Sequence, residues 1–161
     1  MSVDSPLPQQ DSTAPEVDGT IAHADLTRLH DYWLSKRAGR RFPARADIDP
    51  QELRFLLGSI LLIDVLWEPL RFRYRLTGTT IVLTSGYSLH GRGPEEVEDE
   101  EYRARIFRAF ERVATAGVPY ARTTTRMLDG RPRTYDALVL PLSGDQRRVD
   151  MLLGAQIYRP E

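Results

Sequence analysis

The sequence predicts an α+β domain in which one long helix and several short helices cover the inner face of a five-stranded antiparallel sheet. Residues 71–77 alternate arginine with apolar or aromatic side chains, as in a strand with one buried face. Residues 102–116 repeat apolar side chains at helical spacing, which indicates a long amphipathic helix. Three further apolar segments, 120–128, 133–142 and 149–159, are separated by turn residues and complete the sheet.

Length and composition limit the classes of function. With 161 residues the chain is expected to form one domain, residues 23–161, preceded by a disordered tail of Pro, Ser, Asp and Gln at residues 1–22. A net charge of −1 argues against nucleic acid and anionic membranes as partners. No signal peptide is recognised, and the longest apolar stretch, 55–67, is too short for a bilayer. We therefore expect a cytoplasmic protein.

The first predicted element is a helix over residues 24–38 that stops at Gly39. Leu26, Leu29 and Trp33 recur on one face of this helix. Because this apolar face lies far in sequence from the other core segments, we expect it to pack against another apolar surface. It packs on the outer face of the sheet, or it forms a dimer interface, and both readings stay open.

A basic cluster follows this helix, with Arg37, Arg40 and Arg41 in close succession. Cyclic-dinucleotide readers of the PilZ type carry spaced arginines, but the Asp/Asn-x-Ser-x-x-Gly partner motif is not found here. The cluster is therefore interpreted as solvated arginines or as ion pairs with the acidic run near residue 98.

A short helix is predicted to begin at Asp49-Pro50-Gln51-Glu52, a capping residue followed by proline at the first helical position. Leu53, Leu56 and Leu57 are expected to face the core, and Gly58 ends the helix. Residues 59–67 then read as a strand buried on both faces, and Glu68-Pro69 turns the chain into the strand at 72–77. At Gly78 the alternation stops, and Thr79 is expected to cap one helical turn over 79–83.

Glycines at 86, 91 and 93 break the chain before the long helix. His90 lies among them and is interpreted as a surface loop residue rather than a haem ligand. Six carboxylates between Glu95 and Glu101 complement the helix dipole at its start, and Gly117 stops the helix. Its apolar stripe is read as core: Tyr102, Ile106, Ala109, Phe110 and Val113.

Turn signals fix the order of the last three strands. Asp129-Gly130 favours a tight turn between the first two, and Ser143-Gly144-Asp145 opens the turn before the third. The two closing strands are apolar on both faces, which indicates a sheet that is covered on both sides.

The strand that runs through Tyr74 to Gly78 and directly into a short helix resembles the small PAS-like domains found as stand-alone proteins in alphaproteobacteria. The segments Tyr32-Trp33 to Pro50, Leu57-Gly58 to Asp64, and Leu140-Pro141-Leu142-Ser143 with Val149-Asp150 to Gly154 resemble the same family. The resemblance covers residues 24–159. It implies a PAS-like fold, in which residues 86–94 form a side wall and the long helix closes a cup over the inner sheet face.

The resemblance also implies which side chains face the cup. Flavin-binding PAS photoreceptors present an inward glutamine two residues after a glycine, and this chain has Gly154-Ala155-Gln156. Alternation then places Tyr135, Ala137 and Val139 inward. The candidate ligand-binding residues are Phe72, Tyr74, Leu76, Ile106, Phe110, Tyr135, Val139 and Gln156. The opposite register and the first helix supply the candidate interface residues: Leu26, Leu29, Trp33, Leu138, Leu140, Leu153 and Ile157.

No cofactor, metal site or catalytic group is expected. Photoactive flavin and thioester chromophores need a cysteine, and the sequence has none; haem-binding relatives need a histidine on the long helix, which is also missing. His23, His30 and His90 are too far apart to suggest a metal site. Asp64 and Asp136 are the strand acids considered for an acid–base pair, and Asp136 is expected to point away from the cup, so an acid–base enzyme is disfavoured.

Two functions remain. The leading one is a non-enzymatic PAS signalling or interaction module that acts as a homodimer or by docking on a partner signalling protein. The alternative is a sensor that binds a small metabolite in the cup, with Tyr74, Tyr135 and Gln156 as convergent polar groups in an apolar pocket.

Overall fold

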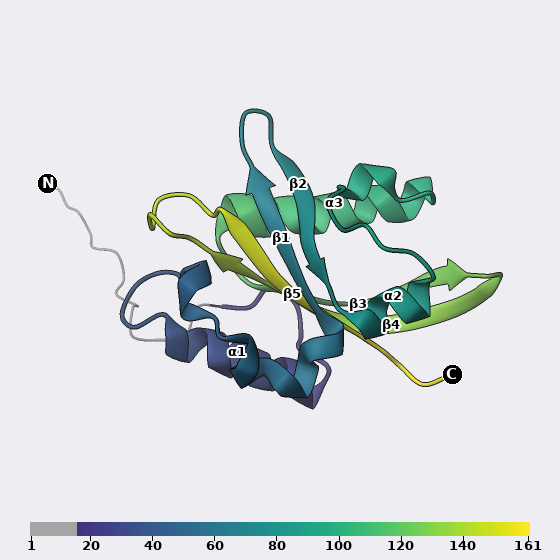
Figure 1. Cartoon of the computed structure of the whole chain (residues 1–161), viewed down its shortest axis with the longest axis horizontal. Helices are drawn as coiled ribbons and strands as arrows, with labels where there is room; N and C mark the ends of the chain where they lie inside the picture. Colours follow the sequence, from purple (N-terminus) through teal and green to yellow (C-terminus); the bar gives the residue numbers. More distant parts are fainter. Residues whose placement is uncertain (1–15) are drawn as a thin grey trace, which may run out of the picture.

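The computed structural model describes residues 16–161 and shows one five-stranded antiparallel sheet with helices on both faces (Figure 1). The strand order is β2-β1-β5-β4-β3, so the last strand of the chain lies in the middle of the sheet. The predicted α+β class and the five antiparallel strands are confirmed.

β1 (Ile60–Leu66) and β2 (Arg71–Thr77) form the first hairpin. Their pairing contains a bulge, because Leu62 pairs with Leu76 whereas the next residue, Ile63, pairs with Tyr74. The extra residue reverses the facing of everything after it. Leu76 therefore joins Leu62 on the outer face and is 41% exposed, while Thr77 takes the inner face. The prediction that Leu76 lines the cup is wrong for this reason.

β3 (Tyr120–Leu128), β4 (Arg131–Leu142) and β5 (Met151–Tyr158) continue the sheet. Asp129 and Gly130 form the predicted tight turn, and both have positive φ, at 52° and 74°. The pairing of β4 with β5 places Val139 opposite Gly154 and Ala137 opposite Gln156. This is the predicted register.

The inner face is covered by α3 (Glu100–Ala116), which contacts β3, β4 and β5. The carboxylate of Asp99 caps its first turn, and every residue of its predicted stripe is buried. α2 (Thr79–Ser85) and the 3₁₀ helix η4 (Pro94–Glu96) precede it. The cap of α2 is Gly78 rather than the predicted Thr79, which is already the first helical residue.

α1 (Ala24–Lys36) lies on the outer face, on the opposite side of the sheet from α3 (Figure 1). The indole N–H of Trp33 donates a 2.8 Å hydrogen bond to the carbonyl of Pro141 in β4. The six predicted interface residues other than Ile157 are at most 1% exposed within this single chain: Leu26, Leu29, Trp33, Leu138, Leu140 and Leu153. These residues therefore pack on one another inside one chain and are not open to a second copy.

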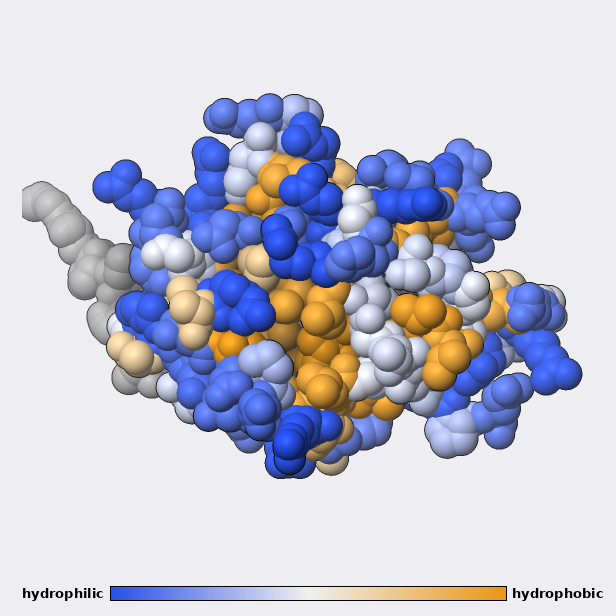
Figure 2. Space-filling view, in the orientation of Figure 1, coloured by the Kyte–Doolittle hydropathy of each residue, from blue (hydrophilic) through white to orange (hydrophobic). Residues whose placement is uncertain are grey.

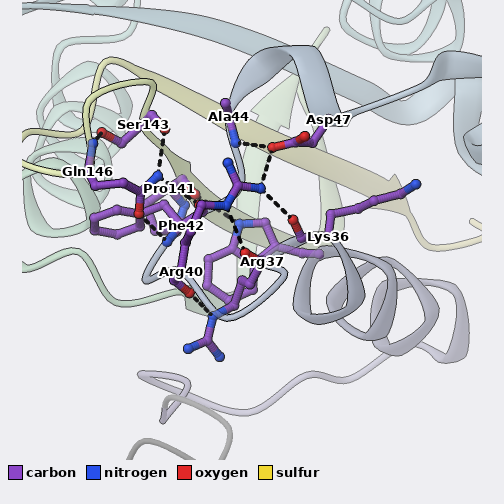
Figure 3. Close-up of polar contacts among 10 residues, drawn as sticks. Lys36, Arg37, Arg40, Phe42, Ala44, Asp47, Pro141, Ser143 and Gln146 are labelled. Atoms are coloured by element: carbon purple, nitrogen blue, oxygen red, sulfur yellow. Dashed lines mark hydrogen bonds and ion pairs between the residues drawn. The ribbon is translucent and has the colours of Figure 1, made fainter.

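The basic cluster fixes the end of α1 instead of pairing with the acidic run near residue 98 (Figure 3). Arg40 donates to the carbonyl of Lys36 and to the carboxylate of Asp47, which also accepts from the backbone N–H of Ala44. Phe42 and Gln146 exchange two hydrogen bonds between the backbone and the side-chain amide. The segment after α1 is thereby tied to the turn between β4 and β5.

Two 3₁₀ helices, η2 (Arg45–Asp47) and η3 (Pro50–Ser59), lead into β1. Asp49 caps η3 through its side chain, as its position before Pro50 predicts. Leu53 and Leu56 are buried, but Leu57 is 50% exposed, so the prediction that Leu57 faces the core is wrong. A 3₁₀ helix has three residues per turn, which places Leu53 and Leu56 on the same side and leaves Leu57 turned away.

The N-terminal segment runs along the edge of the sheet. Residues 1–15, most of the predicted tail, lie outside the described residues. Within residues 16–22, Asp18 bridges to Tyr120 through its backbone and pairs with Arg112 through its carboxylate. This part of the predicted tail is paired with β3 in the structure.

Candidate functional site

The inner face of the sheet and α3 enclose a common interior to which distant parts of the chain contribute. The ring of Tyr74 in β2 lies 6.0 Å from the ring of Phe110 in α3, in an edge-to-face arrangement. Tyr74, Ile106 and Gln156 line the same cavity. Three of the predicted cup residues thus surround one space, although they come from β2, α3 and β5.

Most of the cup is filled by its own side chains. Phe72 stacks edge-to-face against both Phe107 and Phe110, with ring centres 5.3 and 5.4 Å apart. Tyr102 and Tyr135 share a 2.7 Å hydrogen bond between their hydroxyl groups. Phe72, Phe110, Tyr135 and Val139 are therefore buried core residues that do not reach the remaining cavity.

The remaining cavity has a volume of about 30 Å³. This is room for a water molecule, whereas pockets for drug-sized ligands measure roughly 300–1,000 Å³. A larger groove of about 450 Å³ lies beside the cavity. The same four residues line both spaces: Ser85, Tyr87, Leu89 and Arg126.

Polar groups are concentrated in this small cavity. Arg126, Gln156, Thr77 and three tyrosines contribute to the wall, together with apolar groups from Leu61, Ile81 and Leu89. Burial raises the pKa of both Tyr74 and Tyr102 well above the ordinary value of about 10. Their hydroxyls therefore stay neutral at physiological pH and can donate hydrogen bonds.

Arg126 is the cation of the cup and was not among the predicted site residues. It is 8% exposed, and its guanidinium lies 3.9 Å from the centre of the Tyr102 ring. One of its terminal nitrogens donates a 2.8 Å hydrogen bond to the Tyr87 hydroxyl. Burial opposes the charged form, but the neighbouring Tyr102 and Tyr87 outweigh it, so the pKa of Arg126 is raised.

A signal for Arg126 was present in the sequence. A two-residue turn at Asp129-Gly130 sets Leu128 opposite Arg131, and from there Arg126 opposite Arg133 and Thr124 opposite Tyr135. Tyr135 was already predicted to face inward, so the same alternation places Thr124 and Arg126 inward. The inward position of Thr77 had no such signal, because it depends on the bulge in β2.

A family model described as a PAS domain matches residues 21–157. The chain belongs to the PAS domain family. This confirms the PAS-like prediction, and PAS domains are generally signalling or sensor modules. Among curated proteins, no sequence matches the chain.

Solved structures share the fold of this PAS domain at low sequence identity. The PAS domain of BvgS from Bordetella pertussis is 20% identical, with a TM-score of 0.53 over 69% of this chain and 86% of that one. A light-oxygen-voltage domain studied with a flavin analogue is 15% identical, with a TM-score of 0.54 over 69% and 84%. The light-oxygen-voltage domain of the blue-light photoreceptor Aureochrome1, in its dark form, is 18% identical, with a TM-score of 0.50 over 69% and 82%.

No three His, Asp or Glu side chains in residues 16–161 lie close enough to hold a metal ion. No helix among the same residues is both long and apolar enough to cross a membrane.

Proposed function

We propose that this PAS domain is a non-enzymatic sensor whose signal is a small molecule bound in the cup. The observation that carries the proposal is the polar cavity wall. The Nε of Arg126 and the hydroxyl of Thr77 are buried there without a hydrogen-bond partner among the described residues. Buried polar groups of folded proteins nearly always have partners, so unpartnered ones indicate where a ligand or water binds.

A bound flavin does not fit this cup in the conformation described. A flavin ring system needs a pocket in the range of several hundred Å³, about ten times the cavity present here. The space that it would need is filled by the packed aromatic side chains of Phe72, Phe110 and Tyr102. The proposed ligand is therefore much smaller than a flavin.

The non-enzymatic part of the proposal is supported by the state of the strand acids. Asp64 is paired with Arg75 at 2.9 Å, and Asp136 with Arg159 at 2.8 Å. Both carboxylates are engaged by arginine, and neither lines the cavity where a substrate would bind. Neither acid therefore suits general acid–base work on a substrate in the cup.

The test uses the full chain, purified under mild conditions. Native mass spectrometry, with and without denaturation, should reveal a co-purifying small molecule. A thermal-shift screen of metabolites should find compounds that raise the melting temperature. The shift should shrink in Gln156→Leu and Tyr74→Phe and persist in Gln51→Leu, an exposed control. No co-purifying molecule and no stabilising compound would contradict the proposal.

A second candidate function, homodimerisation, is favoured by one surface. Leu57, Leu76 and Leu83 are 50%, 41% and 82% exposed, and the end of η3 lies against the start of α2. Figure 2 shows apolar residues over the middle of the sheet and again over α2, on the side of the molecule that carries α1. Exposed apolar patches of this kind mark interaction sites.

Light scattering after size exclusion tests this second candidate. A dimer should dissociate in the double variant Leu57→Asp/Leu83→Asp and persist in Met127→Asp, which changes a residue that is 56% exposed at the far end of β3. A parent protein that is monomeric at all concentrations would exclude a homodimer.

A further inference from the structure

The guanidinium of Arg126 has no negative partner in the described part of the chain. The ten ion pairs there include Arg40, Arg75 and Arg159, but none involves Arg126. Its neighbours are neutral groups, namely the Tyr102 ring, the ring and hydroxyl of Tyr87 and the Tyr158 hydroxyl, and its Nε has no hydrogen-bond partner among the described residues. Arginine cannot be deprotonated in a protein, so a full positive charge is buried in the cup without a counter-ion.

A buried guanidinium without a counter-ion is matched by one class of ligand, the carboxylates. A guanidinium presents its N–H groups as a planar fork that fits a carboxylate through two parallel hydrogen bonds. Tyr74, Thr77 and Gln156 line the same cavity, and their side chains carry the hydroxyl and amide groups that can hydrogen-bond the remaining oxygen positions. We propose, building on the sensor function above, that the ligand of the cup is a small monocarboxylate paired with Arg126.

The ligand would enter from the neighbouring groove. Tyr87 and Leu89 separate the cavity from this groove, and both spaces share them as wall residues. They lie in a short segment between Gly86 and Gly91, whose φ angles of 87° and 80° favour glycine. The Tyr87 hydroxyl occupies the Arg126 nitrogen that a carboxylate would take. Binding of the ligand therefore displaces Tyr87 and couples the occupied cup to this surface segment.

The charge of the groove selects against a second negative group. Four carboxylates line it, Glu96, Glu98, Asp99 and Asp129, against only two arginines, Arg92 and Arg126. A dicarboxylate or a phosphate would place negative charge against these acids, which is unfavourable at close range. A ligand with one carboxylate, directed inward, and a neutral remainder avoids this repulsion.

The experiment measures binding of defined probes to the full chain by calorimetry and thermal shift at constant ionic strength. Sodium formate and sodium acetate, the smallest monocarboxylates, suit a cavity of this size, with formamide and acetamide as their neutral counterparts and sodium succinate and sodium phosphate as the more highly charged anions. At least one monocarboxylate should bind and raise the melting temperature, whereas the amides, succinate and phosphate should bind at least about tenfold more weakly.

Variants separate binding at Arg126 from a structural role. Arg126→Met should weaken monocarboxylate binding by about 30-fold or more, and Arg126→Lys should weaken it less, because the charge is kept but the fork is lost. Arg122→Met is the matched control: it is on the same strand and the same face, stacks on Tyr120, and does not line the cavity. Tyr87→Phe removes the competing hydroxyl and should bind at least as tightly as the parent.

The outcomes distinguish this inference from the sensor function on which it rests. Amides that bind as well as acids, or an Arg126→Met variant that binds the acids like the parent, would overturn the monocarboxylate and leave the sensor in place. The same holds if a co-purifying ligand proves to lack a carboxylate. If no probe binds and no small molecule co-purifies, the inference and the sensor function both fail.

Discussion

Arg126 and Tyr102 form the closest cation–aromatic pair at the cavity, with the guanidinium carbon 3.9 Å from the ring centre. Tyr102 comes from the first turn of α3 and Arg126 from β3, so this contact joins the helix that closes the cup to the edge of the sheet. The Tyr102 hydroxyl is bonded to Tyr135, which fixes the ring beneath the cation. A charge is thereby held at the cavity by packing and not by an ion pair.

This relationship predicts that Arg126 contributes little to stability. Arg126→Met removes a cation–aromatic contact, but it also removes the cost of burying a charge without a counter-ion. The free energy of unfolding should change by at most about 1 kcal/mol in urea titration. Phe110→Ala, which empties a packed position in the same cup, should cost about 3–5 kcal/mol. A loss of more than about 3 kcal/mol for Arg126→Met would mean that the arginine serves the fold.

Asp136 should make stability depend on acid pH. The hydrogen bond from Arg159 lowers the pKa of Asp136; burial acts in the opposite direction, and the Thr123 hydroxyl lowers it further. A carboxyl group with a lower pKa in the folded than in the unfolded state stabilises the protein above its unfolded pKa of about 4. That contribution is lost as the pH falls below about 4.

Asp136→Asn should therefore be less stable than the parent by about 1–2 kcal/mol at pH 7, since it loses a charge-assisted pair whose arginine is half exposed. The difference between the two proteins should shrink when urea titrations are repeated from pH 5 down to pH 3. A difference that stays constant over this range would show that ionisation of Asp136 is not its cause.

Trp33 should be the main attachment of α1 to the sheet. Trp33→Ala should cost about 3–5 kcal/mol and expose Leu138, Leu140 and Leu153, which increased binding of a hydrophobic dye would report. Trp33→Phe keeps much of the packing but leaves the carbonyl of Pro141 without its donor, at a cost of about 1–2 kcal/mol. Asp31→Ala, on the exposed side of α1, serves as the control and should change little. If Trp33→Phe and Trp33→Ala lost equal stability, packing of the ring would contribute little to the attachment of α1.

At the turn between β3 and β4, the effect of a substitution at Gly130 on stability should depend on backbone conformation alone. Gly130 has a φ of 74°, and a Cβ added there would meet no atom within 4 Å. Gly130→Ala should therefore cost about 1 kcal/mol through strain, and Gly130→Asn less, because asparagine tolerates this region better. Urea titration of both variants provides the check. A larger loss in Asn than in Ala would contradict the argument from φ.

Part of the candidate site could be predicted from the sequence. The resemblance to PAS photoreceptors placed Gln156 on the inner face, and alternation from it placed Tyr135 and Val139 there, because strands without a bulge keep a period of two. The same rule failed at Leu76, since one extra residue in β2 shifts the facing and no local pattern announces it. Arg126 could have been placed by extending the register across the Asp129-Gly130 turn.

Four features could be predicted from the residues alone: the α+β class, the order of helices and strands, the turn at Asp129-Gly130 and the two apolar faces of the closing strands. These features depend on neighbouring residues, whose spacing is written directly in the chain. The three-dimensional packing was needed to show that α1, and not a second chain, covers Leu138 and Leu140. It was also needed to show that the cup is nearly full and that Arg126 has no counter-ion among the described residues, because both follow from how segments distant in sequence pack together.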